Sequence, residues 1–398
     1  MVDQTVVAAP GKPRLAPICG LAIARLRLAF DHRACMDLPA ESVYLFRHAL
    51  VRQAAYQLQP PIQRAAIHRL ALQLLEQTPG LNLRALALEL ADHAQAGLAG
   101  APPGQEAELR EKYIHYLGQG ADYARFNYDY GAAIEALGRL LPMIEQQPQR
   151  RMRATDILAD LHQRMGRHEA ARENFEYLAA HAQDDGYRGR ALVHLAWDAH
   201  ERGDLPAASR WADEGEALNA RVNNSQLQVA FLLYRAKECA GRNDHTRAIE
   251  FQEQALQLAR QTHDFVQVIV AHNNLAEALV ALGRTQEAQA HLDQAEPMVR
   301  EPQLANLRAA LLLCRSSLLR VLGDQRAAAL PLLEVEAFAR QTGSMGLLAM
   351  VLLRRAELLA DAGHDAKARA EAQRALDLGR ESGDTHAIKA AQAMLGQA

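Results

Sequence analysis

Apolar residues recur at every fourth position in residues 46–60, FRHALVRQAAYQLQP. These apolar positions are Phe46, Leu50, Ala54 and Leu58. The spacing places them on one face of an α-helix, and Pro60 marks where that helix ends. Arg47, His48 and Arg52 then lie among the polar positions of the same helix. We interpret these three as surface residues or as contacts between domains, rather than as part of a reactive site.

Helical stretches separated by a single turn residue recur along the rest of the chain with a step of about forty residues. Six similar strings, among them MGRHEAARENFEYL and LGRTQEAQAHLDQA, carry this turn residue, which we call the anchor. The anchors are Gly166, Gly203, Asn243, Gly283, Gly323 and Gly363, at steps of 37, 40, 40, 40 and 40. An earlier unit fits with Tyr128 as its anchor. Gly and Asn favour the left-handed backbone that ends a helix, so the sequence predicts consecutive helix-turn-helix pairs.

Small residues stand at two fixed offsets from every anchor. Seven residues before it are Ala121, Ala159, Ala196, Ala236, Ala276, Ser316 and Ala356. Five residues after it are Ala133, Ala171, Ala208, Ala248, Ala288, Ala328 and Ala368. One small residue on each helix of a pair allows the two helices to approach closely. We therefore predict that the alanine five residues after each anchor is an interhelical contact.

A second series of turns ends the second helix of several pairs. The strings ARQTHD, ARQTGS and GRESGD begin at Ala259, Ala339 and Gly379, and they are rich in turn-forming residues. From Thr385 the chain continues as THAIKAAQAMLGQA, which we interpret as a closing helix that covers the last pair. The predicted fold is all-α: a solenoid of about seven helix pairs wound as a right-handed superhelix, behind a short helical adaptor. The expected divisions are a poorly ordered or remnant segment 1–40, an adaptor 41–106, repeats 107–384 and a capping helix 385–398.

The repeats resemble the tetratricopeptide repeat (TPR). Gly166, Ala171 and Phe175 have the spacing of that family's glycine, alanine and aromatic positions. The usual period of the family is 34 residues, and the longer step of about forty is similar to the TPR-like arrays of large bacterial signalling regulators. The resemblance covers roughly residues 107–398. It implies a TPR-like superhelix that binds other proteins and carries no catalytic site.

The segment before the repeats resembles the winged-helix and linker part that joins the ATPase core to the TPR arm in bacterial STAND signalling ATPases. The matching positions are Phe46, His48, Leu50, Arg52, Ala55, Tyr56, Arg64 and His68. In related STAND proteins a histidine of this part can contact the nucleotide. The chain departs from the family because it has no GxxxxGK[ST] phosphate-binding loop; the APGKPR string at 9–14 does not fit that pattern. The resemblance therefore implies an arm without its ATPase domain, which belongs to a separate chain or a longer gene, unless the arm works alone.

Composition narrows the function classes. The chain is 49% hydrophobic and only 5% aromatic, with a net charge of -3, which argues against a nucleic-acid partner. Four scattered cysteines without a CxxC fit a reducing cytoplasm, and no run of 18 apolar residues predicts a membrane span. Sixteen histidines show neither HExxH nor ligand-like spacing, and hydrolase, kinase and dinucleotide signatures are missing. We expect no metal, no cofactor and no enzymatic activity.

The first helix of each TPR pair lines the inner face of the superhelix, so we expect certain positions on it to meet a partner. By resemblance these positions stand ten, nine and six residues before each anchor. The candidate groove residues are His194, Trp197, Tyr234, Lys237, Asn273, Asn274, Glu277 and Arg354. Trp197 and Tyr234 are expected as exposed anchors of an interface. Asn274 is the candidate for bonding the backbone of a bound peptide.

The leading hypothesis is a non-catalytic scaffold or sensor arm of a cytoplasmic bacterial signalling system, which binds a protein or peptide through its concave face. An alternative is a fragment or subunit of an ATP-dependent regulator, linked to a kinase or cyclase, whose catalysis lies in another chain. A transcriptional activator arm is disfavoured, because no basic helix-turn-helix follows the closing helix.

Overall fold

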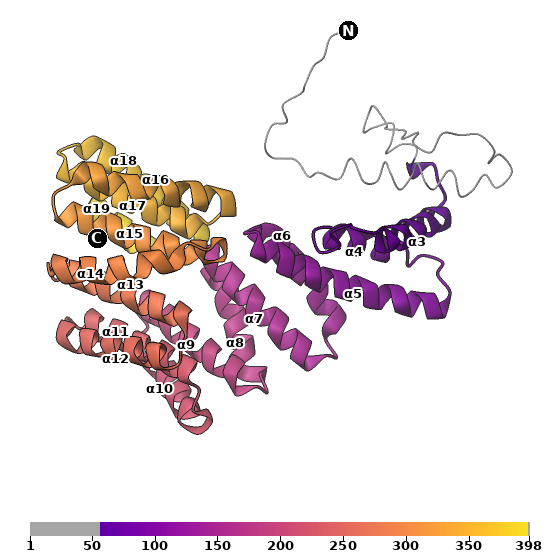
Figure 1. The fold of residues 1–398 in the computed structure, drawn as a ribbon, viewed down its shortest axis with the longest axis horizontal. Helices are drawn as coiled ribbons and strands as arrows, with labels where there is room; N and C mark the ends of the chain where they lie inside the picture. Colours follow the sequence, from indigo (N-terminus) through magenta and orange to yellow (C-terminus); the bar gives the residue numbers. More distant parts are fainter. Residues whose placement is uncertain (1–55, 397–398) are drawn as a thin grey trace, which may run out of the picture. The chain divides into compact units, whose positions relative to one another are not determined.

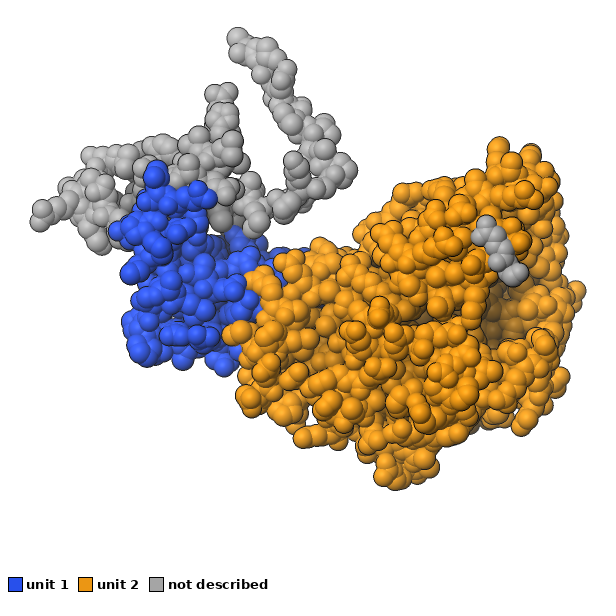
Figure 2. All heavy atoms as spheres, turned by 180° about the vertical axis from the view of Figure 1, so that it is seen from behind, with its two compact units in different colours: residues 1–123 blue, residues 124–398 orange. Residues whose placement is uncertain are grey.

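The computed structural model describes residues 56–396, apart from the side chain of Pro302. In this part of the chain every regular element is helical (Figure 1). The prediction of an all-α fold is therefore confirmed. The described residues fall into two compact units, which divide between Tyr123 and Ala124 (Figure 2). The predicted helix over residues 46–60 lies outside the described residues, except for its last five positions.

The first unit contains α3 (Pro61–Gln77), α4 (Ala87–Ala96) and most of α5 (Pro103–Phe126). An ion pair joins α5 to α3, because Lys112 Nζ lies 2.8 Å from Glu76 Oε2. The Tyr116 hydroxyl donates to the other oxygen of the same carboxylate over 2.7 Å. Two side chains of α5 thus hold one residue of α3, which fixes how these two helices pack.

The second unit continues the array as helix pairs. Its first helices are α7 (Pro148–Arg164), α9 (Asp185–Arg202), α11 (Ser225–Gly241), α13 (Phe265–Ala281), α15 (Ala305–Val321) and α17 (Met345–Asp361). Its second helices are α6 (Tyr130–Leu140), α8 (His168–His181), α10 (Leu205–Val222), α12 (His245–Gln261), α14 (Thr285–Ala295), α16 (Gln325–Thr342) and α18 (Asp365–Ser382). A final helix, α19 (Thr385–Leu395), begins where the sequence predicted a closing helix.

Every anchor residue takes the left-handed conformation that the sequence predicted for it. The φ angles are 60° at Tyr128, 75° at Gly166, 85° at Gly203, 61° at Asn243, 71° at Gly283, 84° at Gly323 and 75° at Gly363. A second series of positive φ angles ends the second helices at Asn223, His263, Gly343 and Gly383. This second series includes the three predicted turn strings. Both kinds of turn are therefore encoded locally, by residues that tolerate the left-handed region.

The second series begins at the end of α10, since α6 and α8 end without a left-handed residue, and it is interrupted after α14. Pro297 and Pro302 lie in the short 3₁₀ helices η2 (Glu296–Val299) and η3 (Pro302–Leu304) that connect α14 to α15. Proline lacks the backbone N–H that an α-helix needs, so α14 ends early.

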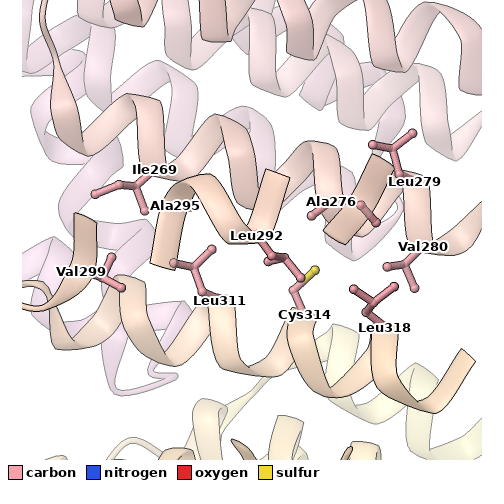
Figure 3. Close-up of a cluster of buried hydrophobic side chains, with 11 residues drawn as sticks. Ile269, Ala276, Leu279, Val280, Leu292, Ala295, Val299, Leu311, Cys314 and Leu318 are labelled. Atoms are coloured by element: carbon pink, nitrogen blue, oxygen red, sulfur yellow. The ribbon is translucent and has the colours of Figure 1, made fainter. Parts of the chain in front are cut away.

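The small residues at the two fixed offsets are buried, and within the second unit they lie between the helices of each pair. All seven alanines that follow the anchors are buried, as are all seven small residues that precede them. Ser316 Oγ donates to the carbonyl of Ala328 over 2.7 Å, so α15 and α16 approach within a hydrogen bond at these two positions. Figure 3 shows the corresponding core at α13, α14 and α15, with Ala276 and Leu292 among its side chains. Ala288 belongs to the same cluster. The predicted interhelical contact is confirmed.

The array winds far enough for its early turns to touch its late helices. The N-terminus of α15 meets the turn before α6: the Ala305 amide donates to the Tyr128 hydroxyl over 3.1 Å. The side-chain amide of Asn306 donates to the Tyr130 hydroxyl over 2.8 Å. We call this row of contacts between early anchor turns and late helix starts the seam.

The seam continues at the next two turns. Ser344 Oγ, at the start of α17, donates to the carbonyl of Arg164 over 2.6 Å. His168 and Asp384, at the start of α19, form an ion pair with 3.8 Å between Nε2 and Oδ2. The Asp384 carboxylate raises the pKa of His168, which favours the charged form of the pair. Lys389 of α19 donates to the carbonyl of Glu201 over 2.9 Å. Three successive anchor turns thus lie against three successive helix starts.

Candidate functional site

A cluster on α9 and α11 brings together two of the predicted groove residues. Lys237 Nζ lies 5.4 Å from the centroid of the Trp197 ring and 3.4 Å from Glu201 Oε1. Trp197 is half-buried, and its ring meets Tyr234 edge-on with the centroids 6.0 Å apart. The ammonium group, the aromatic ring and the carboxylate together form a surface that is partly apolar and partly charged. Surfaces of this kind are found at protein interfaces.

Tyr234 is not the exposed anchor that the sequence analysis expected. Its side chain is 0% exposed, and burial raises its pKa to about 12. The ring lies against both helices of the preceding pair, α9 and α10, where small residues leave room for it. Those small residues are Ala196, Ala199, Ala208 and Ala212. The prediction that Tyr234 offers exposed area to a partner is therefore wrong, although its ring packs edge-on against the ring of Trp197.

His194 also lies deeper than expected for a contact residue. Its ring stacks on Phe175 with the centroids 4.4 Å apart and 8° between the planes. Burial lowers its pKa to about 4, so the ring is neutral near pH 7. A neutral, stacked imidazole packs α9 against α8.

The polar residues of α13 form the middle of the predicted face. Asn273 and Asn274 are half-buried and Glu277 is exposed. Asn273 Oδ1 is a buried acceptor with no hydrogen-bond partner among the residues that the structure describes. A buried amide oxygen without a hydrogen bond is unfavourable, so a bound partner that donates a hydrogen bond to it would bind more tightly.

A charged group on α15 and α17 contains the last predicted residue. Arg354 donates to both oxygens of Glu357 over 3.0 and 3.2 Å. Arg320 lies 3.4 Å from Glu357 and donates to Asp361 over 2.9 Å. Cys314 of α15 packs in one apolar cluster with Ala276 and Leu279 of α13. Burial there raises the pKa of its thiol.

The sequence analysis missed Glu201, Arg320 and Asp361 as members of this face. They stand two or three residues before their anchors, which is one helical turn beyond the position at minus six. Extending the same offset rule by one turn would have found them. Together with the predicted residues they make a polar row over successive first helices.

The predicted interdomain residues Arg47, His48 and Arg52 lie outside the described residues, so that prediction remains. Within the first unit, His68 bonds the Tyr56 hydroxyl over 2.9 Å and the ring of His93 over 2.7 Å. Burial and the neighbouring His93 lower the pKa of His68 to about 4.

Residues 56–396 lack two kinds of feature that would indicate other functions. No group of three or more His, Cys, Asp or Glu side chains in that stretch is arranged to hold a metal ion. No helix there is both long and apolar enough to cross a membrane.

Comparison with known proteins supports the fold. The tetratricopeptide repeat family matches residues 228–301, the region of α11 to α14. The chain is similar in structure to a Rap protein solved in complex with Competence and Sporulation Factor, with a TM-score of 0.57 and 11% identity over 84% of this chain and 98% of that one. No curated protein matches in sequence. The chain is thus an all-α, TPR-like solenoid.

Two further similarities are weaker. The quorum sensor NprR from B. thuringiensis, in its apo form, aligns with a TM-score of 0.47 and 12% identity over 83% of this chain and 99% of that one. A STAND protein with a tetratricopeptide repeat sensor, from Pyrococcus horikoshii, aligns with a TM-score of 0.44 and 14% identity over 88% of this chain and 55% of that one.

Proposed function

We propose that this chain is a non-catalytic interaction scaffold or sensor arm that binds a protein or peptide along the polar row of its first helices. The observation that carries the proposal is the Trp197–Lys237 cluster beside the half-buried asparagines of α13. Directional donors and acceptors next to an aromatic ring suit an extended peptide, whose backbone offers both kinds of group. The Rap structure contains a bound factor, which supports the proposal at the level of the fold. We further propose a cytoplasmic, bacterial signalling context.

The decisive variant is Lys237→Ala combined with Asn274→Ala. A matched control is Lys367→Ala with Gln289→Ala, which also removes one lysine and one carboxamide side chain, but from exposed positions of the second helices α18 and α14. Proteins captured from a cell extract by the wild type would be compared quantitatively with those captured by each variant. The affinity of the protein that only the first variant loses would then be measured with purified components.

We expect the first double variant to weaken this binding by roughly 2 kcal/mol or more, about thirtyfold. Its helical circular dichroism and melting should match those of the control, because partly exposed changes alter stability by only about 0.5 kcal/mol. Equal binding by both variants would place the partner elsewhere. Unfolding of the first variant alone would show that these side chains belong to the core.

An alternative proposal is that the chain is the arm of an ATP-dependent regulator whose phosphate-binding loop lies in another chain. It rests on the resemblance of the segment that contains Arg64 and His68 to the linker of STAND ATPases. Isothermal titration of the purified chain with ATP tests the premise that both proposals share, namely that this chain itself does not bind the nucleotide. We expect no binding at micromolar concentrations, because the sequence contains no GxxxxGK[ST] phosphate-binding motif. Micromolar binding would mean that the chain itself contains a nucleotide site.

A further inference from the structure

A hollow opens on one edge of the second unit, between the turns that precede α11 and α13. It is formed by residues 222–226 and 262–266 and encloses about 760 Å³. Phe265 and Val266 stand at its rim with 69% and 46% of their surfaces exposed. Two large apolar side chains at the mouth of a hollow are unusual on a solvated turn and indicate a contact surface.

The chain contains a second hollow of the same construction, and that one is filled. It lies three steps, or 120 residues, further on, between the turns that precede α17 and α19. The anchor turn of Gly166 fills it: a Cβ added at Gly166 would lie 3.1 Å from the Gly346 amide nitrogen and 3.4 Å from Ser382 Cβ. Ser344 and Asp384 are buried there, at 2% and 8% exposure. The equivalent residues of the open hollow, Asn224 and Asp264, are only half-buried.

The filled hollow shows what such a site accepts. Its occupant is a tight turn between two helices, with a left-handed glycine that has no side chain to keep the backbones apart. Ser344 Oγ donates to the carbonyl two residues before that glycine. In the open hollow Asn224 takes the place of Ser344. Its side-chain oxygen accepts from the amides of Gln226 and Leu227, so its NH₂ group can donate outward.

A turn with matching features lies on the opposite edge of the array. Gly323 has the same left-handed backbone as Gly166, and nothing lies within 4 Å of a Cβ added to it. Val321 and Leu322, just before it, are 45% and 51% exposed. The carbonyl of Val321 stands two residues before Gly323, where the carbonyl of Arg164 stands before Gly166.

We propose that the hollow at 222–226 and 262–266 binds the turn 321–325 of a second copy of this chain. Leu322 and Val321 cover Phe265 and Val266, and Asn224 donates to the Val321 carbonyl. The contact is of the same kind as those of the seam, an anchor turn held between two helix starts, but it forms between two chains. Because the two surfaces differ, the association is head-to-tail: each copy keeps one open hollow and one free turn, and the assembly grows with concentration.

Two single variants and their mixture test the proposal on the full chain. Leu322→Asp damages the turn, Phe265→Asp damages the hollow, and Leu330→Asp is the control, since Leu330 is equally apolar, 65% exposed on α16 and outside both surfaces. Sedimentation velocity over a concentration series gives the assembly state, and circular dichroism confirms folding. Because Leu322 and Phe265 are exposed, neither change should unfold the chain.

We expect the wild type and the control to associate progressively with concentration. Each single variant should raise the dissociation constant by about thirtyfold, as the loss of an interface anchor does. An equimolar mixture of Leu322→Asp and Phe265→Asp should stop at a dimer, because only one intact turn and one intact hollow remain. A wild type that stays monomeric up to about 1 mM, the limit of weak association, would overturn the proposal. So would single variants that associate as the wild type does, or a control that loses association with them.

Discussion

Substituting alanine at Gly166 should destabilise the chain more than the same substitution at other anchors. Gly166 has a φ of 75°, and Gly283 has a φ of 71°. In both variants an alanine must adopt the left-handed backbone, which costs roughly 1–2 kcal/mol. The positions differ in their surroundings, because a Cβ has open space at Gly283 and meets the Gly346 backbone at 3.1 Å at Gly166. The steric cost of the added Cβ therefore arises only at Gly166, where the turn lies in the seam.

The magnitude follows from that distance. At 3.1 Å the added carbon is closer than an ordinary van der Waals contact, and the atom opposite is backbone nitrogen at a helix start, which cannot rotate away. Overpacking of this kind typically costs about 1–3 kcal/mol. We therefore expect Gly166→Ala to lose about 2–5 kcal/mol of unfolding free energy, as the sum of both terms. Gly283→Ala should lose only the first term.

Urea unfolding followed by circular dichroism would measure both variants against the wild type. Hydrogen exchange at the amides of residues 344–348 would report whether the seam itself has loosened. Equal losses of stability in the two variants, with unchanged exchange at the start of α17, would refute the idea that the seam contributes to stability. The comparison needs no assumption about the cost of a left-handed alanine, since that cost is common to both.

Two other predictions concern the core and acid pH. Ala288→Leu should cost about 1–3 kcal/mol by overpacking α13 against α14, whereas Ala290→Leu, exposed on the same helix, should stay within about 0.5 kcal/mol; equal melting temperatures would contradict the assigned contact. Burial, with His291 and Arg260 nearby, lowers the pKa of His272 from 6.5 to about 4. Between these two values the folded state binds fewer protons at His272 than the unfolded state does. The stability that the neutral His272 contributes is therefore fully present above pH 6.5 and is lost as the pH falls toward 4. Wild type should lose more stability than His272→Gln over that range, as followed by melting temperature; parallel pH curves would count against this cause.

The helix pairs and their close contacts could be predicted because they depend on local features. A glycine or asparagine at an anchor fixes the turn, and an alanine five residues later fixes how closely the helices meet, so one repeat predicts the next. Even Tyr128, which is neither glycine nor asparagine, takes the left-handed backbone that its place in the period required. The period was thus a stronger signal than the residue type.

The groove was harder to predict because exposure depends on neighbouring pairs. Tyr234 stands at an offset that faces inward in the family, yet the small side chains of α9 and α10 let its ring sink between the helices. The repeat period does not predict the seam either. Ser344, Asp384 and Lys389 look like ordinary helix-capping and surface residues, and their partners lie in turns 180 to 216 residues earlier. Such contacts depend on how far the whole array winds.

The seam also changes how the chain must fold. A linear repeat array is stabilised only by contacts between neighbours, so its two ends fray independently and folding can start anywhere. In this chain Tyr128 and Ala305 are bonded across 177 residues, and Arg164 and Ser344 across 180. Contacts of such long sequence separation form late, because closing a large loop costs entropy before any contact is gained. The early pairs therefore complete their contacts only after the last helices are in place, which couples the two ends into one cooperative unit and slows its assembly.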